Sequence, residues 1–208
     1  MPTASSQSTA VGVCKATLNI LVLVLFAQQA LASYQLFATT RSVRVFGAVV
    51  VGTLFLALFV LRRPAKEETP SLSLWLLATA GAALPMLMRP SSGSPYLEIG
   101  YAVQVCGFAM LTAALLSLRR SFAVVPGNRG VREGGLYRII RHPVYVAELT
   151  TLFGVVLANP TLANVLIWLC ECGVQYVRAR AEEDFLSSDP VYRAYRERVR
   201  YRLIPGVL

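Results

Sequence analysis

Six apolar blocks separated by short polar segments constrain this chain more than any other feature of its sequence. A helix needs about 20 apolar residues to cross the hydrocarbon core of a bilayer, and only helices and closed barrels satisfy their backbone polar groups there. Charged residues make up 15% of the chain, against about a quarter in a soluble domain. The sequence predicts an all-α, polytopic membrane helical bundle with five to six transmembrane helices and a cytosolic C-terminal helical tail. The blocks cover residues 13–37, 43–61, 72–88, 96–118, 144–158 and 162–177.

The first block has two interpretations. Residues 13–37 are long enough to span a membrane, but Lys15 followed by an apolar run and then Ala30-Leu31-Ala32 also resembles a secretory signal peptide with its cleavage site. We take the block as the first membrane helix and leave the second interpretation open. The preceding residues, 1–12, are small and polar and are predicted to be disordered.

The distribution of basic residues predicts the orientation. The formal net charge is +9, and Lys and Arg total 20. With six spans and a cytoplasmic N-terminus, Arg41, Arg44 and Arg89 fall outside and the other seventeen fall inside. Because cytoplasmic segments carry the excess of Lys and Arg, both termini are predicted to face the cytoplasm. The basic residues cluster at the ends of the apolar blocks, and membrane topology explains this clustering and the positive net charge. We therefore expect no nucleic-acid partner.

The last two blocks are predicted to form a helical hairpin. Asn159-Pro160 makes a tight turn between residues 144–158 and 162–177, and the first of these blocks is short for a full span. In the polar tail, Asp189-Pro190 is expected to start a further helix and Pro205-Gly206 to end it.

Two polar stretches flank this hairpin and carry the candidate chemistry. Arg141 and His142 precede its first helix, where Pro143 suits the first turn, and Glu182 and Glu183 follow its second helix. A hairpin returns the chain to its starting depth, so cationic and anionic side chains are expected to meet in a site for a polar, zwitterionic ligand. Taken singly, each group is more simply an interface anchor or a solvated helix face.

The motifs of the second half resemble those of a known family. In order, they are Gly135-Leu-Tyr-Arg-Ile-Ile-Arg-His-Pro-Val-Tyr145, Asn159-Pro160, Glu182-Glu183 with Leu186, Tyr192, Tyr195, Arg198 and Ile204-Pro205. This pattern resembles the isoprenylcysteine carboxyl methyltransferase family, and phospholipid N-methyltransferases and membrane sterol reductases share parts of it. The resemblance divides the chain into N-terminal transmembrane helices at residues 1–120 and a methyltransferase core of cofactor loop, hairpin and tail at residues 121–208.

The resemblance implies an integral membrane methyltransferase that uses S-adenosylmethionine in a cytosol-facing pocket. It implies that Arg198 closes the pocket or orients the substrate, with Arg138 and Arg141 as the other candidates. It implies a lipid-soluble or small-molecule methyl acceptor taken from the membrane lipid phase. The residues that it assigns to the cofactor are Val131, Gly135, Leu136, Tyr137, His142, Tyr145, Glu182 and Glu183.

Two further glutamates lie within the apolar blocks. Glu148 stands where the family usually has glycine, and Glu171 shares a helix face with Gln175, Arg178 and Glu182. A carboxylate inside a membrane helix costs about 2.5–3.5 kcal/mol on the insertion scale and is a functional candidate by default. Either glutamate could accept a proton from an amine or thiol acceptor, or serve a structural pairing with a buried arginine.

Two other functions remain open at this stage. A nicotinamide-dependent membrane reductase of the related sterol-reductase fold would need room for a larger cofactor, and a non-catalytic scaffold would use the basic tail to bind anionic lipid. No cysteine spacing suits a metal site, so no metal is expected. The sequence leaves the acceptor undefined among thiols, carboxylates and amines.

Overall fold

The computed structural model describes residues 4–89 and 94–206 of the chain, and within them the predicted helical bundle is confirmed. Two short strands, β1 (Glu67–Glu68) and β2 (Gly127–Asn128), pair antiparallel. The helices are α1 (Ala4–Thr40), α2 (Val43–Leu61), α3 (Leu72–Ala83), α4 (Leu97–Leu118), α5 (Pro143–Ala158), α6 (Leu162–Leu186) and α7 (Pro190–Arg198), with 3₁₀ turns η1 (Leu84–Leu87), η2 (Arg119–Ser121) and η3 (Gly135–Arg138). Because α1 begins at Ala4, the disorder predicted for residues 1–12 is wrong for residues 4–12; residues 1–3 lie outside the described residues.

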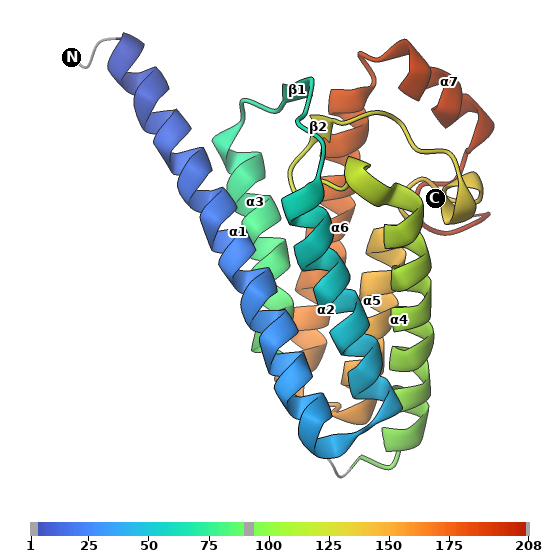
Figure 1. Cartoon of the computed structure of the whole chain (residues 1–208). Coiled ribbons are helices and arrows are strands. Elements are labelled where there is room, and N and C mark those ends of the chain that lie inside the picture. Colours follow the sequence, from blue (N-terminus) through green and yellow to red (C-terminus); the bar gives the residue numbers. More distant parts are fainter. Residues whose placement is uncertain (1–3, 90–93, 207–208) are drawn as a thin grey trace.

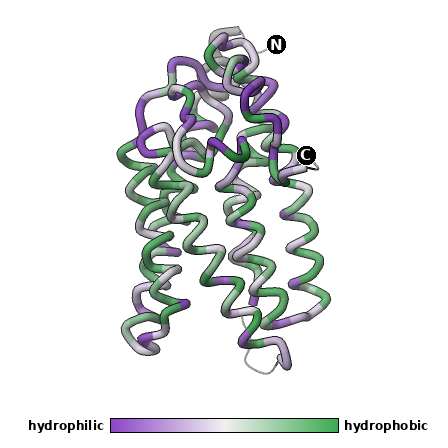
Figure 2. Tube along the Cα trace, turned by 90° about the vertical axis from the view of Figure 1, so that its right-hand side faces the viewer, coloured by the Kyte–Doolittle hydropathy of each residue, from purple (hydrophilic) through white to green (hydrophobic). Residues whose placement is uncertain are grey.

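The first six helices run alternately up and down, so the connections gather at two ends of the bundle (Figure 1). We call the end that carries β1, β2, η3 and α7 the polar end, and the opposite end the distal end. The tube coloured by hydropathy is mostly hydrophobic along the bundle and hydrophilic at the polar end (Figure 2). The arrangement therefore puts Arg41, Arg44 and Arg89 at the distal end, apart from the other basic residues, as the sequence predicted.

Three helical stretches of the described chain are long and apolar enough to cross a membrane: Gly12–Thr40, Val43–Leu61 and Leu97–Ser121. The stretches Leu72–Leu87 and Pro143–Ala158 are apolar but shorter. Helix α6 is long, yet it carries a buried polar series that lowers its hydropathy: Asn164, Glu171, Gln175 and Arg178. These side chains face the bundle and not its surface, so α6 can lie in the same layer as the spanning helices.

Helices α4 and α5 approach closely through small residues, which is the usual device of membrane helix pairs. A Cβ atom on Gly107 of α4 would lie 2.3 Å from Oγ1 and 2.7 Å from the backbone nitrogen of Thr151 on α5. At Gly100, a Cβ would lie 2.6 Å from the backbone nitrogen of Ala158. The absence of these side chains lets α5 rest directly against α4.

We expect Gly107→Val to lower the free energy of unfolding by about 1–3 kcal/mol, because the added side chain would push against the Thr151 backbone. Gly173→Val on α6 is the control, since a Cβ there meets nothing within 4 Å. Denaturant unfolding of the purified variants measures both. Equal stability of the two variants would contradict the close contact of α4 with α5.

The tail forms a short helix followed by an extended segment. Asp189 caps α7 by accepting a hydrogen bond from the Val191 backbone N–H at 2.8 Å, and Pro190 is its first residue, as predicted. The predicted end of this helix at Pro205-Gly206 is wrong, because α7 ends at Arg198. The residues that follow run back across the start of α5 instead of continuing the helix.

Candidate active site

The side chain of Glu183 is the centre of the polar end. It is 1% exposed and is surrounded by cationic and imidazole groups. Nε of Arg141 donates to Oε1 at 2.7 Å, and Nη2 of Arg202 donates to Oε2 at 2.9 Å. Nε2 of His142 lies 3.1 Å from Oε1. A buried carboxylate needs this kind of compensation, since each ion loses several kcal/mol of hydration on burial.

The extended tail segment holds the start of α5 in place. The backbone N–H groups of Arg141 and His142 donate to the carbonyl oxygens of Tyr201 and Arg202, at 2.9 and 3.1 Å. Nη1 of Arg141 donates to the carbonyl of Val199 at 2.8 Å. The predicted meeting of the Arg141-His142 pair with the two tail acids is therefore confirmed, and the α5–α6 hairpin is the cause, since it returns the chain to the polar end (Figure 1).

A fall in pH is expected to weaken the hydrogen-bonded cluster around Glu183. Burial alone would raise the pKa of Glu183, but hydrogen bonds from His142, Arg202 and Arg141 outweigh it and hold the pKa well below its ordinary value of 4.5. The ionised group therefore stabilises the fold above about pH 4.5, and this contribution is lost as the pH falls toward the lowered pKa.

We expect the free energy of unfolding to decline between about pH 5 and pH 3. Unfolding measured along that range should show a shallower decline in Glu183→Gln than in the native protein. Parallel declines in the two proteins would contradict the assignment to Glu183.

A second layer of side chains lies between Glu183 and the bundle interior. The Tyr145 hydroxyl donates to Oε2 of Glu182 at 3.0 Å. The rings of His142 and Tyr145 stack with centroids 5.3 Å apart and 2° between their planes, and the Arg178 guanidinium lies 5.0 Å from the centroid of the Tyr145 ring. Glu182 keeps 31% of its side chain exposed, so this layer offers an accessible carboxylate beside aromatic faces.

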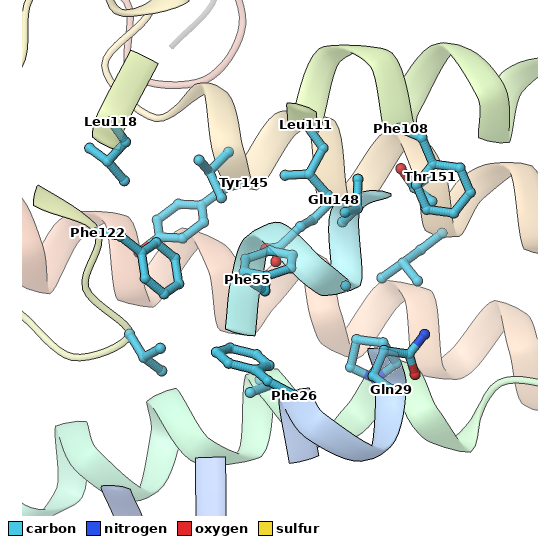
Figure 3. A pocket seen from close by; sticks show the side chains of 18 of the residues that line it. Phe26, Gln29, Phe55, Phe108, Leu111, Leu118, Phe122, Tyr145, Glu148 and Thr151 are labelled. Carbon is cyan, nitrogen blue, oxygen red and sulfur yellow. The ribbon is translucent and has the colours of Figure 1, made fainter. Parts of the chain in front are cut away.

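This layer opens into a cavity of about 330 Å³ between the helices. The cavity size lies at the lower end of the range for small-molecule sites, about 300–1,000 Å³. Its polar-end wall includes Tyr137, Arg141, His142, Tyr145 and Glu182, and its middle is lined by apolar side chains (Figure 3). The apolar side chains labelled there are Phe26, Phe55, Phe108, Leu111, Leu118 and Phe122. A polar mouth thus continues into an apolar interior.

The in-membrane glutamates belong to one buried network beside this cavity. Nε2 of Gln175 donates to Oε2 of Glu148 and to Oε1 of Glu171, both at 2.8 Å. Nη1 of Arg178 donates to Oε1 of Gln175 at 3.0 Å. The predicted polar face of α6 is confirmed, and it turns inward. Glu148 lines the cavity, whereas Glu171 is fully buried and does not.

The structure divides the predicted site residues into two groups. Those that line the cavity are Tyr137, Arg141, His142, Tyr145, Glu148 and Glu182. Those that do not line it are Val131, Gly135, Leu136, Glu171, Glu183 and Arg198. A sequence motif groups residues that are close together in the chain. Because neighbouring residues along a helix or turn point in different directions, only some residues of a motif line the cavity.

The residues outside the cavity have other contacts. Arg198 is exposed and donates to Glu133 at 2.5 Å, while Val131 packs against the cluster around Tyr192 and Tyr195. Gly135 has a φ of +61°, and a Cβ there would lie 2.2 Å from the Ser117 hydroxyl. Leu136 packs at the edge of the main apolar core. Arg138, the further candidate, is exposed at the surface.

The sequence did not single out Arg202 or the extended segment that carries it. Arg202 completes the ring around Glu183, and its neighbours provide the carbonyl groups for the Arg141 and His142 backbone. One signal was present, because a carboxylate at a membrane helix end requires counter-charges, and the tail holds seven arginines. No local sequence pattern indicates which of these arginines folds back onto Glu183.

Fold and site together define a helical membrane protein with a cavity that joins a polar mouth to an apolar interior. Residues 96–193, from the turn before α4 to the start of α7, match the phospholipid methyltransferase family model. The resemblance to the superfamily of membrane methyltransferases that includes the isoprenylcysteine and phospholipid enzymes is therefore confirmed over slightly less than half of the chain. No curated protein gives a significant match. The family match supports a membrane methyltransferase.

Proposed function

We propose that the chain transfers a methyl group from S-adenosylmethionine to a lipophilic or small thiol, carboxylate or amine acceptor, with the polar end facing the cytoplasm. The observation that supports it most is the cavity that begins at His142, Tyr145 and Glu182 and continues into apolar walls. Such a cavity can admit a polar donor from water and an apolar acceptor from lipid. The crowding of basic residues at the same end supports the cytoplasmic orientation.

The residues present suit this donor. A sulfonium cation is attracted to aromatic faces and to carboxylates, and the mouth provides Tyr145, Phe122 and Glu182. Ribose hydroxyls and the donor's amino group need hydrogen-bond acceptors, which Glu182 supplies. Glu183, in contrast, is occupied by Arg141, His142 and Arg202, so we assign it the positioning of His142 and not direct donor contact.

The bound donor would supply an electrophilic methyl group, and the protein would supply placement. Alignment of reacting atoms about 3–3.5 Å apart contributes several kcal/mol to such reactions. The apolar walls exclude water, which favours the loss of charge when an anionic nucleophile, a thiolate or a carboxylate, attacks the sulfonium. For an amine or thiol acceptor, we assign the role of proton acceptor to Glu148, a carboxylate that lines the cavity on α5.

Incubation of the purified protein with methyl-labelled S-adenosylmethionine and a total lipid and thiol extract tests the proposal. We expect a labelled product that is identified by its mass. Parallel titration with a reduced nicotinamide cofactor distinguishes the reductase alternative. Binding of the nicotinamide without binding of S-adenosylmethionine would overturn the proposal, and binding of neither would favour the scaffold.

We expect Glu182→Gln to weaken S-adenosylmethionine binding by about 10- to 100-fold, because a hydrogen bond to a charged group contributes about 1.5–3 kcal/mol. The partly exposed position of Glu182 predicts little change in folding stability. Equilibrium titration measures the affinity. Glu197→Gln, an exposed substitution on α7, is the control, and equal affinities of the two variants would remove Glu182 from the donor site.

A further inference from the structure

The cavity extends well beyond the proposed donor site. Leu118 and Gln104 both line it, and they lie fourteen residues apart on α4. At 1.5 Å per residue this is about 21 Å along the helix axis. Figure 3 shows Leu118 and Phe122 on one side of the view and Gln29 and Thr151 on the other. The cavity is therefore elongated, with an aromatic middle and a second polar group of side chains at its distal end.

That second group is Arg44 of α2, Gln29 of α1 and Gln104 of α4, all of which line the cavity. The Arg44 guanidinium lies 4.4 Å from the centroid of the Tyr101 ring, and its Nη1 donates to Oε1 of Gln104 at 3.4 Å, a long hydrogen bond. Gln104 is 3% exposed. Three polar side chains from three helices thus line the end of the cavity that lies opposite its polar mouth.

Arg44 lacks the compensation that the cations of the polar end have. Its Nε is buried and has no hydrogen-bond partner among the described residues. No carboxylate of the described chain lies within 4.0 Å of it. At the polar end, by contrast, Arg141 and Arg202 share the Glu183 carboxylate. A half-buried cation without a counter-ion is costly, and it indicates that an anion completes the site.

An interface anchor is the simpler role for an arginine at a helix end. The other distal arginines fit that role, since Arg41 and Arg89 are exposed and do not line the cavity. Arg44 differs because it is half-buried and lines the cavity, next to the buried amide of Gln104. An ionisable group that faces the interior of a membrane bundle marks a ligand site.

We propose that the distal end of the cavity binds the acid group of a single-chain amphiphile, whose hydrocarbon chain lies along the aromatic middle. The planar guanidinium matches a carboxylate or a phosphate oxygen pair. The side chains of Gln29 and Gln104 supply further hydrogen-bond donors, and the apolar middle accommodates the chain. This site rests on the distal residues and on the apolar middle of the cavity, and it goes beyond the proposed methyl transfer.

Palmitate is the probe that tests the site. Equilibrium binding to the purified full-length protein in non-ionic detergent compares palmitate with methyl palmitate, which has the same chain but no charge. We expect palmitate to bind at least about tenfold more tightly, as a charged hydrogen bond predicts. Equal binding of the two would overturn the proposal, and this comparison needs no variant.

Variants of Arg44 test whether this side chain causes the preference for palmitate over methyl palmitate. Arg44→Met should abolish the preference for palmitate, Arg44→Lys should keep part of it, and Arg41→Met, at the same end but outside the cavity, should keep all of it. A preference retained in Arg44→Met would overturn the assignment.

Dipalmitoyl phosphatidate, measured in parallel, distinguishes a phospholipid ligand from a fatty acid. Tighter binding of this two-chain lipid than of palmitate would overturn the proposal of a single-chain ligand. S-adenosylmethionine titration of the same samples keeps a failure here separate from a failure of the proposed reaction.

Discussion

Replacing Glu183 with alanine is expected to lower the free energy of unfolding by about 3–5 kcal/mol. The loss is large because the substitution removes one partner and leaves Arg141, His142 and Arg202 crowded around a buried site without their anion. The native carboxylate is 1% exposed, so water cannot replace it without opening the polar end. Denaturant unfolding of the purified protein, followed by far-UV circular dichroism, measures the effect.

The neighbouring acid provides the control for this prediction. Glu182→Ala removes a carboxylate from the adjacent position, but its side chain is 31% exposed and its hydrogen bond is to a neutral hydroxyl. We expect it to cost less than about 1.5 kcal/mol. If the two alanine variants were equally stable, the central role of Glu183 in holding the tail against α5 would be contradicted.

Glu148→Gln is expected to reduce turnover by about 10²- to 10⁴-fold with an amine or thiol acceptor, the range that a positioned general base contributes. Gln keeps the shape of the side chain and can still hydrogen-bond to Gln175, so the buried network should persist. What it removes is the ability to take a proton from a group in the cavity. Once an acceptor has been identified, single-turnover transfer of the labelled methyl group measures the chemical step directly.

Glu171→Gln is the matched variant, because Glu171 bonds the same Gln175 amide but does not line the cavity. We expect its turnover to stay within a few-fold of the native value, since a group outside the cavity cannot reach the acceptor. An equal loss in both variants would point to the network as a structural element. Unchanged turnover in both would end the proton-acceptor hypothesis for this pair.

The meeting of the two polar stretches was predictable for a physical reason. Asn159-Pro160 forces a turn, and α6, which has 25 residues against the 16 of α5, is long enough to return the chain to the level at which α5 started. The helical spacing of Glu171, Gln175 and Arg178 predicted that they share one face, and the structure shows this face buried. Both predictions need only helix geometry and the cost of exposing charge to lipid.

Other features depend on contacts between segments that are distant in the sequence. Nothing near Glu182 or Glu183 indicates which of them turns toward the cavity, because adjacent residues on a helix point about 100° apart and only packing decides which direction is inward. The end of α7 at Arg198 was missed because backbone contacts with Arg141 and His142 favour the extended conformation of the following residues. Local propensity does not include such contacts.

The sequence by itself determined that this is a helical membrane bundle, where the helices after the first one begin and turn, and which charged groups gather at one end. These properties follow from hydrophobicity, helix periodicity and turn chemistry, which act over a few residues. The tertiary structure alone decided that Glu183 is enclosed while Glu182 faces the cavity, and that Arg202 folds back to Glu183. It also decided that Arg44 lines the cavity with its Nε unpaired among the described residues. These depend on how helices pack, and packing is set by the shapes of all the neighbours together.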